Sequence, residues 1–166
     1  HLMKKKGHDV RCIHFRIGNT RKVKEIARRI GCKLKIKRHA PTLRKIRRRC
    51  NVSLTCVLCK RAMLTKAAKY AKRIGADALL TGDNLGQVAS QTMDNLEVES
   101  RYIDVPIIRP LIGFTKQEVI DLSKNKGLYA LSIKDAKKCS YVPKKPATHS
   151  DLALVDAEWK KLKIKV

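Results

Sequence analysis

The 166 residues suffice for one domain with a core, and a 43% hydrophobic content argues against disorder. The formal net charge of +25, from 39 Lys and Arg against 14 Asp and Glu, favours a polyanionic partner, most often nucleic acid. A basic surface without such a partner usually carries Glu in similar number. Only 4% of residues are aromatic, which favours contact with the phosphates of folded RNA over stacking on unpaired bases.

The cysteines point to metal or redox chemistry. We find no signal-peptide pattern and no apolar run approaching a membrane span, so we expect a cytoplasmic protein with no membrane association. In that compartment a Cys-x-x-Cys such as Cys56 to Cys59 is more often a metal or redox site than a structural disulfide. Cys12, Cys32 and Cys50 are expected to pack as small apolar residues.

Short apolar runs alternate with helical patterns, which predicts β–α units and a mainly parallel sheet. Strands are expected at 10–15, 34–36, 78–81 and 105–110. Helices are expected at about 20–30, 41–49, 59–74, 85–93 and 116–126, with a C-terminal amphipathic helix near 150–163. Thr115 and Glu118 have the pattern of a capping box at the start of the helix at 116–126. Residues 129–149 are predicted to be mostly loop, and the basic amphipathic helix is expected to begin near Cys59, just after the Cys-x-x-Cys.

Residues 2–7 have the pattern of the last turn and C-cap of a helix. A parallel α/β domain rarely begins with such a turn, so we expect a first strand and most of a first helix to precede residue 1. The expected fold is a single domain over residues 1–166, a Rossmann-like three-layer α/β sandwich with a mainly parallel sheet.

The most informative segment is Thr81-Gly-Asp-Asn-Leu-Gly-Gln-Val-Ala-Ser-Gln-Thr92, which follows a short apolar strand. Ligands of open α/β sheets bind at the carboxyl ends of strands, where such turns lie. A nucleotide-type turn together with Cys56-Val-Leu-Cys-Lys-Arg61 suggests activation by a nucleotide followed by sulfur chemistry.

These two motifs, with His14-Phe15, Ile108-Arg-Pro-Leu-Ile-Gly113 and Cys139 before Pro143-Lys-Lys-Pro146, resemble the PP-loop family. The closest similarity is to the catalytic domain of archaeal tRNA 4-thiouridine synthases, over residues 2–148. The resemblance implies a PP-loop ATPase fold that uses ATP with Mg²⁺ to adenylate O4 of a tRNA uridine, at position 8. Sulfur then replaces AMP and leaves 4-thiouridine. A thiolase for another uridine and a non-catalytic RNA-binding module are the alternatives.

The resemblance also implies roles for individual residues. His14 and Phe15 would contact the nucleotide, although an ordinary strand-end histidine is the alternative for His14. Gly82 would allow close approach of the ribose or base, Gln91 would bind an adenine edge, and Lys60 would contact ATP. Lys116 matches a functionally important lysine, with a solvated side chain as the alternative.

Cys56, Cys59 and Cys139 match three cysteines of archaeal relatives. Three thiolates can hold three irons of a [4Fe–4S] cluster and leave the fourth open to a hydrosulfide. Structural zinc generally needs four ligands, and no close fourth cysteine is evident. A Cys56–Cys59 disulfide, a persulfide on Cys139 and a free loop cysteine stay open.

The 166 residues do not contain the family's phosphate-binding Ser-Gly-Gly-x-Asp-Ser, which precedes the equivalent of Leu2, or a THUMP or rhodanese domain. Sulfur must then come from a separate donor, a cysteine desulfurase or inorganic sulfide. The basic segment 33–49 is the best candidate for contact with the tRNA backbone. A homodimer is left open.

Overall fold

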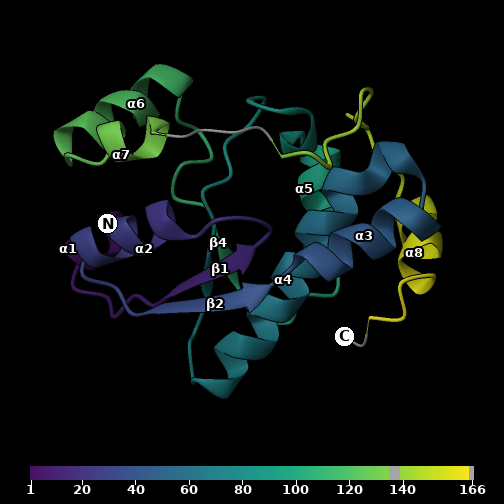
Figure 1. Cartoon of the computed structure of the whole chain (residues 1–166), viewed down its shortest axis with the longest axis horizontal. Coiled ribbons are helices and arrows are strands. Elements are labelled where there is room, and N and C mark those ends of the chain that lie inside the picture. The colour runs from purple at the N-terminus through teal and green to yellow at the C-terminus, as the bar shows by residue number, and fades with distance from the viewer. Residues whose placement is uncertain (135–138, 165–166) are drawn as a thin grey trace. The chain divides into compact units, whose positions relative to one another are not determined.

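The computed structural model describes residues 1–134 and 139–164 (Figure 1). Within these residues the chain forms two compact units, residues 1–40 with 115–134 and residues 41–114 with 139–164. Both units combine helices with parallel strands, which confirms the α/β class. The described strands form two separate two-stranded sheets, one in each unit. A single domain over 1–166 stays a prediction.

The first unit is a β–α–β motif with three further helices. Its elements are α1 (Leu2–Lys5), β1 (Cys12–Arg16), α2 (Arg21–Arg29), β2 (Leu34–Arg38), α6 (Lys116–Asn125) and α7 (Tyr129–Ile133). The strands pair in parallel with Cys12 opposite Leu34, and α2 connects them, as a parallel pair requires. Gly31, at φ +65°, follows the end of α2 and provides the left-handed turn that leads to β2.

Residues 129–149 are not wholly loop, because α7 occupies the first five of them. Gly127 adopts φ +63° after α6, and this turn lets the chain begin a second short helix. Lys22 on α2 donates to the carbonyls of Ser132 and Lys134, and Arg29 donates to that of Gly127. These contacts hold the α6–α7 segment against α2.

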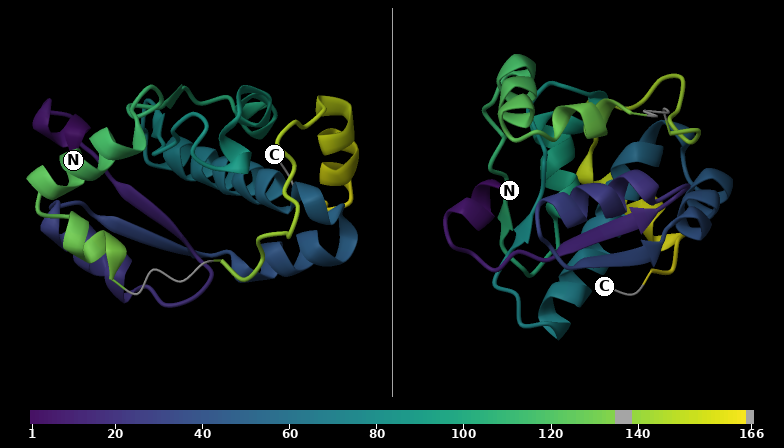
Figure 2. Two further views of the ribbon diagram at one scale, coloured as in Figure 1. Left: turned by 90° about the horizontal axis from the view of Figure 1, so that it is seen from above. Right: turned by 60° about the vertical axis from the view of Figure 1, so that its left-hand side comes forward.

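The second unit is organised around a long helix. Its elements are α3 (Ala40–Arg49), the 3-10 helix η1 (Val52–Leu54), α4 (Thr55–Arg73), β3 (Leu79–Leu80), the 3-10 helix η2 (Ala89–Gln91), α5 (Met93–Ser100), β4 (Ile107–Ile108) and α8 (Leu152–Lys160). Apolar side chains of α3, α4, α5 and α8 form its main core. α8 lies beside α3 and the first half of α4 (Figure 2). Strand β3 pairs in parallel with β4.

A buried arginine fixes α8 to α4. The Arg61 guanidinium lies 2.6 Å from Asp156 Oδ1 and over the rings of Tyr102, at 5.3 Å, and Trp159, at 5.0 Å. Arg61 therefore has a structural role, although it belongs to the Cys-Lys-Arg motif. The part of the chain that the structure describes contains no helix long and apolar enough to cross a membrane.

Candidate functional site

Cys56 and Cys59 lie in the first turn and a half of α4 and not before it, which corrects the sequence prediction. The helical region starts early because the Asn51 side chain accepts from Ser53 N, and η1 then continues into α4. A spacing of three residues places both thiols on one face of the helix.

Cys139 lies in the same unit and is exposed. Burial, together with the negative charges of Cys56 and Cys139, raises the pKa of Cys59 to about 12. Burial also raises the pKa of Cys56, and the negative charge of Cys139 adds to this shift. The structure thus brings the three thiols within electrostatic range of one another.

The three thiols are not arranged as a metal site in the described part of the chain. Among residues 1–134 and 139–164, no group of three or more His, Cys, Asp or Glu side chains is placed to hold a metal ion. All six cysteines fall within these ranges, and none is in a disulfide. Metal binding by Cys56, Cys59 and Cys139 therefore stays a prediction.

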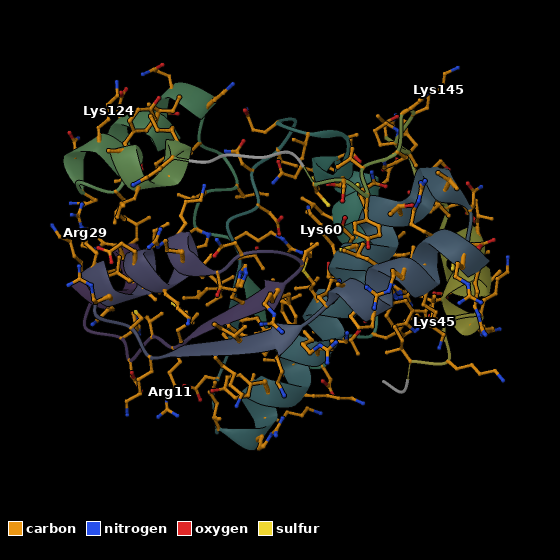
Figure 3. All side chains as sticks on the ribbon, in the orientation of Figure 1. Arg11, Arg29, Lys45, Lys60, Lys124 and Lys145 are labelled. Atoms are coloured by element: carbon orange, nitrogen blue, oxygen red, sulfur yellow. The ribbon has the colours of Figure 1, made fainter. Side chains whose placement is uncertain are left out.

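Lys60, on α4 beside α5, is the centre of a half-buried ionic network (Figure 3). Its Nζ lies 3.1 Å from Asp83 Oδ1, 3.2 Å from Ser90 O and 3.5 Å from Glu99 Oε2. Asp83 and Ser90 accept two of the three hydrogen-bond donors of the ammonium, and Glu99 forms an ion pair with it. A phosphate that binds Lys60 would therefore compete with these groups, which the sequence did not indicate.

Asp83 connects Lys60 to β4. Asp83 Oδ2 accepts from Thr81 Oγ1 at 2.7 Å and lies 3.6 Å from Arg109 Nε. Burial alone would raise the pKa of Asp83, but the Thr81 hydrogen bond and the charges of Lys60 and Arg109 outweigh it and lower the pKa. Asp83 is therefore ionised at neutral pH.

Glu99 is the buried acid of the network, with 1% of its surface exposed. Burial raises its pKa to about 8, Lys60 opposes the shift, and the charge of Asp83 adds to it. Its Oε1 has no hydrogen-bond partner among the described residues. The sequence analysis missed Glu99, although its spacing of three from Leu96 places it on the buried face of α5.

The segment after β3 is not the helix predicted over 85–93. Only η2 is helical there, because Gly86 adopts φ +72° and donates from its backbone N to Gln91 O. Asn84 Nδ2 donates to the carbonyls of Leu111 and Phe114, which holds the loop to the segment after β4. A Cβ at Gly82 would meet no atom within 4 Å, so the backbone is open to a close ligand.

His14, Phe15 and Lys116 belong to the first unit. Burial lowers the pKa of His14, and Phe15 packs edge-on against His39 with 5.6 Å between ring centroids. Lys116 is exposed in the first turn of α6, directly after the N-cap Thr115, and the structure confirms the predicted capping box of Thr115 and Glu118. The second unit holds the other proposed site residues.

Parallel β–α units with an open loop after a strand define an α/β protein, a class in which ligands bind at the carboxyl ends of strands. The profile of the thiamine biosynthesis protein (ThiI) family matches residues 1–164, and the chain belongs to that family.

Two archaeal relatives illustrate the similarity. A probable tRNA sulfurtransferase of Methanocaldococcus jannaschii is 50% identical over 112 residues, covering 68% of this chain and 28% of the relative. That of Thermococcus kodakarensis is 37% identical over 159 residues, covering 87% and 41%. The chain thus spans less than half of these relatives.

One solved structure, a 4-thiouridine synthetase–RNA complex with bound ATP, has a TM-score of 0.83 and 30% identity. The match covers 90% of this chain and 42% of that one.

Glu99 should make stability depend on pH. Its folded pKa of about 8 exceeds the ordinary value of 4.5, so the folded state keeps a proton that the unfolded state loses between these values. Unfolding free energy should then fall as pH rises through this window, with a slope approaching about 1.4 kcal/mol per unit. Glu99→Gln cannot titrate and should remove this slope.

Urea unfolding of wild type and Glu99→Gln at pH 5.5 and 7.5 measures how the unfolding free energy of each protein changes with pH. The comparison with wild type cancels the opposite contribution of His14, whose lowered pKa stabilises the fold as pH rises. Equal pH dependence in the two proteins would show that Glu99 is ionised in the folded state.

Proposed function

We propose that the protein with this chain performs ATP-dependent thiolation of tRNA and converts uridine 8 to 4-thiouridine. The observation that carries the proposal is that Lys60, the residue after Cys59 on α4, binds Asp83 in the open loop after β3. Membership of the ThiI family and the similarity to a 4-thiouridine synthetase support it.

In the proposed reaction, uridine O4 attacks the α-phosphorus of ATP, and pyrophosphate leaves. A hydrosulfide then attacks C4, O4 leaves as an oxygen of AMP, and the sulfur stays on C4 after losing its proton. Within the second unit, Gly82 and Gln91 would hold the adenosine part of ATP. Lys60 would exchange one of its acceptors for a phosphate oxygen. The roles of His14, Phe15 and Lys116 that the resemblance to the family implies stay predictions. Mg²⁺ would offset the charge of the triphosphate.

The direct test is ATP-dependent formation of thionucleosides. The protein, expressed from its native reading frame, is incubated with ATP, unmodified tRNA and sulfide or a cysteine desulfurase. Nucleoside mass spectrometry should detect 4-thiouridine. A different thiouridine would favour the thiolase for another position, and tRNA binding without any product would favour the non-catalytic module. Cytoplasmic location and a homodimer stay predictions.

Nucleotide binding by the loop after β3 can be tested with AMP, because the phosphate-binding Ser-Gly-Gly-x-Asp-Ser is not among these residues. Gln91→Ala should weaken AMP binding about tenfold, the effect of one lost hydrogen bond. Gln87→Ala, an equal truncation at an exposed position of the same loop, should change it little. Calorimetry measures both. No AMP binding at millimolar concentration would contradict the proposed role of this loop.

We propose that Cys56, Cys59 and Cys139 hold an Fe–S cluster that would supply an open iron for a hydrosulfide. The donor set fits, since soft thiolates select such clusters, and the mutual repulsion of three thiolates favours a bound cation. Because the described thiols are not in ligating geometry, binding would draw Cys139 closer to the helix pair. Zinc, a Cys56–Cys59 disulfide and a persulfide on Cys139 are the alternatives.

Iron and sulfide analysis of anaerobically purified protein distinguishes the Fe–S cluster from the three alternatives. Wild type should contain iron and acid-labile sulfide, and Cys139→Ala should lose both, because two protein ligands hold a cluster poorly. The control Cys50→Ala removes a buried thiol that contacts Glu158 O, and it should keep the iron. Thiolation by an iron-free Cys139→Ala protein would leave Cys139 with neither proposed role.

The arginines of α3 are proposed to contact the tRNA backbone. No Asp or Glu occurs between Glu25 and Asp77, so α3 lies in a wholly cationic part of the sequence. Leu43 and Ile46 bury one face of α3, and the other presents exposed arginines, which are Arg44, Arg47, Arg48 and Arg49. Arg49 also donates to Lys161 O at 3.5 Å, which leaves the other three more available.

Replacing Arg44, Arg47 and Arg48 by Gln should weaken tRNA binding and its dependence on salt. Each lost phosphate contact should lower the slope of log affinity against log salt by about one unit. Filter binding between low and moderate salt gives the slope. The control removes three charges from the C-terminal part of α4, at Lys69, Lys72 and Arg73, and should keep the slope. An unchanged slope in the α3 variant would exclude this surface from the interface.

A further inference from the structure

The segment that carries Cys139 has little regular structure of its own, so its position depends on contacts to other elements. In residues 139–149 the turn bond from Val142 N to Cys139 O is local. Contacts to the rest of the unit lie at the far end of the segment. Ala147 N donates to Ser53 O just before α4, and Thr92 Oγ1 donates to Thr148 O.

Asn95 on α5 is the buried part of this attachment. Its exposed fraction is 0%, and its Nδ2 donates to Ala89 O at 2.7 Å, Ala147 O at 3.0 Å and Thr148 O at 3.3 Å. Ala89 begins η2, the turn that contains Gln91. One amide therefore holds the loop after β3 and the Cys139 segment together.

The amide oxygen of the same side chain accepts no hydrogen bond from the described residues. Asn95 Oδ1 is buried and has no hydrogen-bond partner among the described residues. A buried acceptor without a partner costs about 1–3 kcal/mol, so Asn95 is not the best residue for stability alone. Such exceptions in a native fold call for a functional explanation.

We propose that Asn95 is a positioning residue that holds Cys139 near Cys56 and Cys59 by tying its segment to the loop after β3. The proposal rests on the proposed function for its purpose, since it fixes where sulfur meets the activated uridine. Its geometric content, the closeness of Cys139 to the helix thiols, can be measured without thiolation.

The test is the equilibrium of Cys56 and Cys139 with glutathione disulfide, in which the two thiols form one disulfide and release two molecules of glutathione. The equilibrium constant gives the effective concentration of one thiol at the other, quantified by peptide mass spectrometry. Asn95→Asp keeps the shape but replaces the Nδ2 donor with an oxygen that faces three carbonyls. The effective concentration should fall about tenfold or more.

Asn84→Asp is the matched control. Asn84 is also buried and also donates through Nδ2 to two carbonyls, but those belong to Leu111 and Phe114 and not to the Cys139 segment. It should leave the effective concentration within about twofold of wild type. If Asn95→Asp does not fold by circular dichroism, Asn95→Ser, which keeps one donor, replaces it.

An unchanged equilibrium in a folded Asn95 variant would overturn the proposal. An equal fall in Asn84→Asp would do so too, because it would trace the effect to general loosening of the unit. Neither result would bear on thiolation, which the nucleoside assay tests separately.

Discussion

The contacts of Lys60 join three segments that are far apart in the chain. Its ammonium lies on α4 and binds Asp83 in the loop after β3 and Glu99 on α5. Because Cys59 precedes Lys60, the helix that carries the thiols and the loop that is open to a ligand are fixed by the same charge. Buried charges need partners of good geometry, so a change at one member of this network affects the others.

The network also sets the state of the thiols. Glu99 raises the pKa of both Cys56 and Cys59, and Lys60 lowers that of Cys56. Since Glu99 is itself protonated near neutral pH, the local charge before any ligand binds is that of Lys60, Asp83 and Arg109. A phosphate bound near Lys60 would add negative charge, and the buried thiols would then be still harder to ionise. In the proposed reaction, cations or a metal would then have to help these thiols to ionise.

Local signals in the sequence were enough for much of the fold. Hydrophobic periodicity predicted α2, α3, α4, α6 and α8 but not α5 or α7. It also predicted parallel strands, as β1 and β2 are, and Thr115 with Glu118 predicted the start of α6. The helix over 85–93 was wrong, since a left-handed Gly86 and tertiary bonds from Asn84 decide that loop. Asn95 and Glu99 could not be assigned roles, because their partners are distant in sequence. The motifs identified the thiols and the loop, but not the network that connects them.

The central claim is that the Lys60–Asp83 pair holds the thiol helix to the loop after β3. A double-mutant cycle with Lys60→Met, Asp83→Asn and the double variant measures their coupling directly in urea unfolding. The account predicts a coupling free energy of about 1–3 kcal/mol, as for groups of one buried network. Additive effects, with a coupling below about 0.3 kcal/mol, would contradict it and leave the two motifs as independent neighbours.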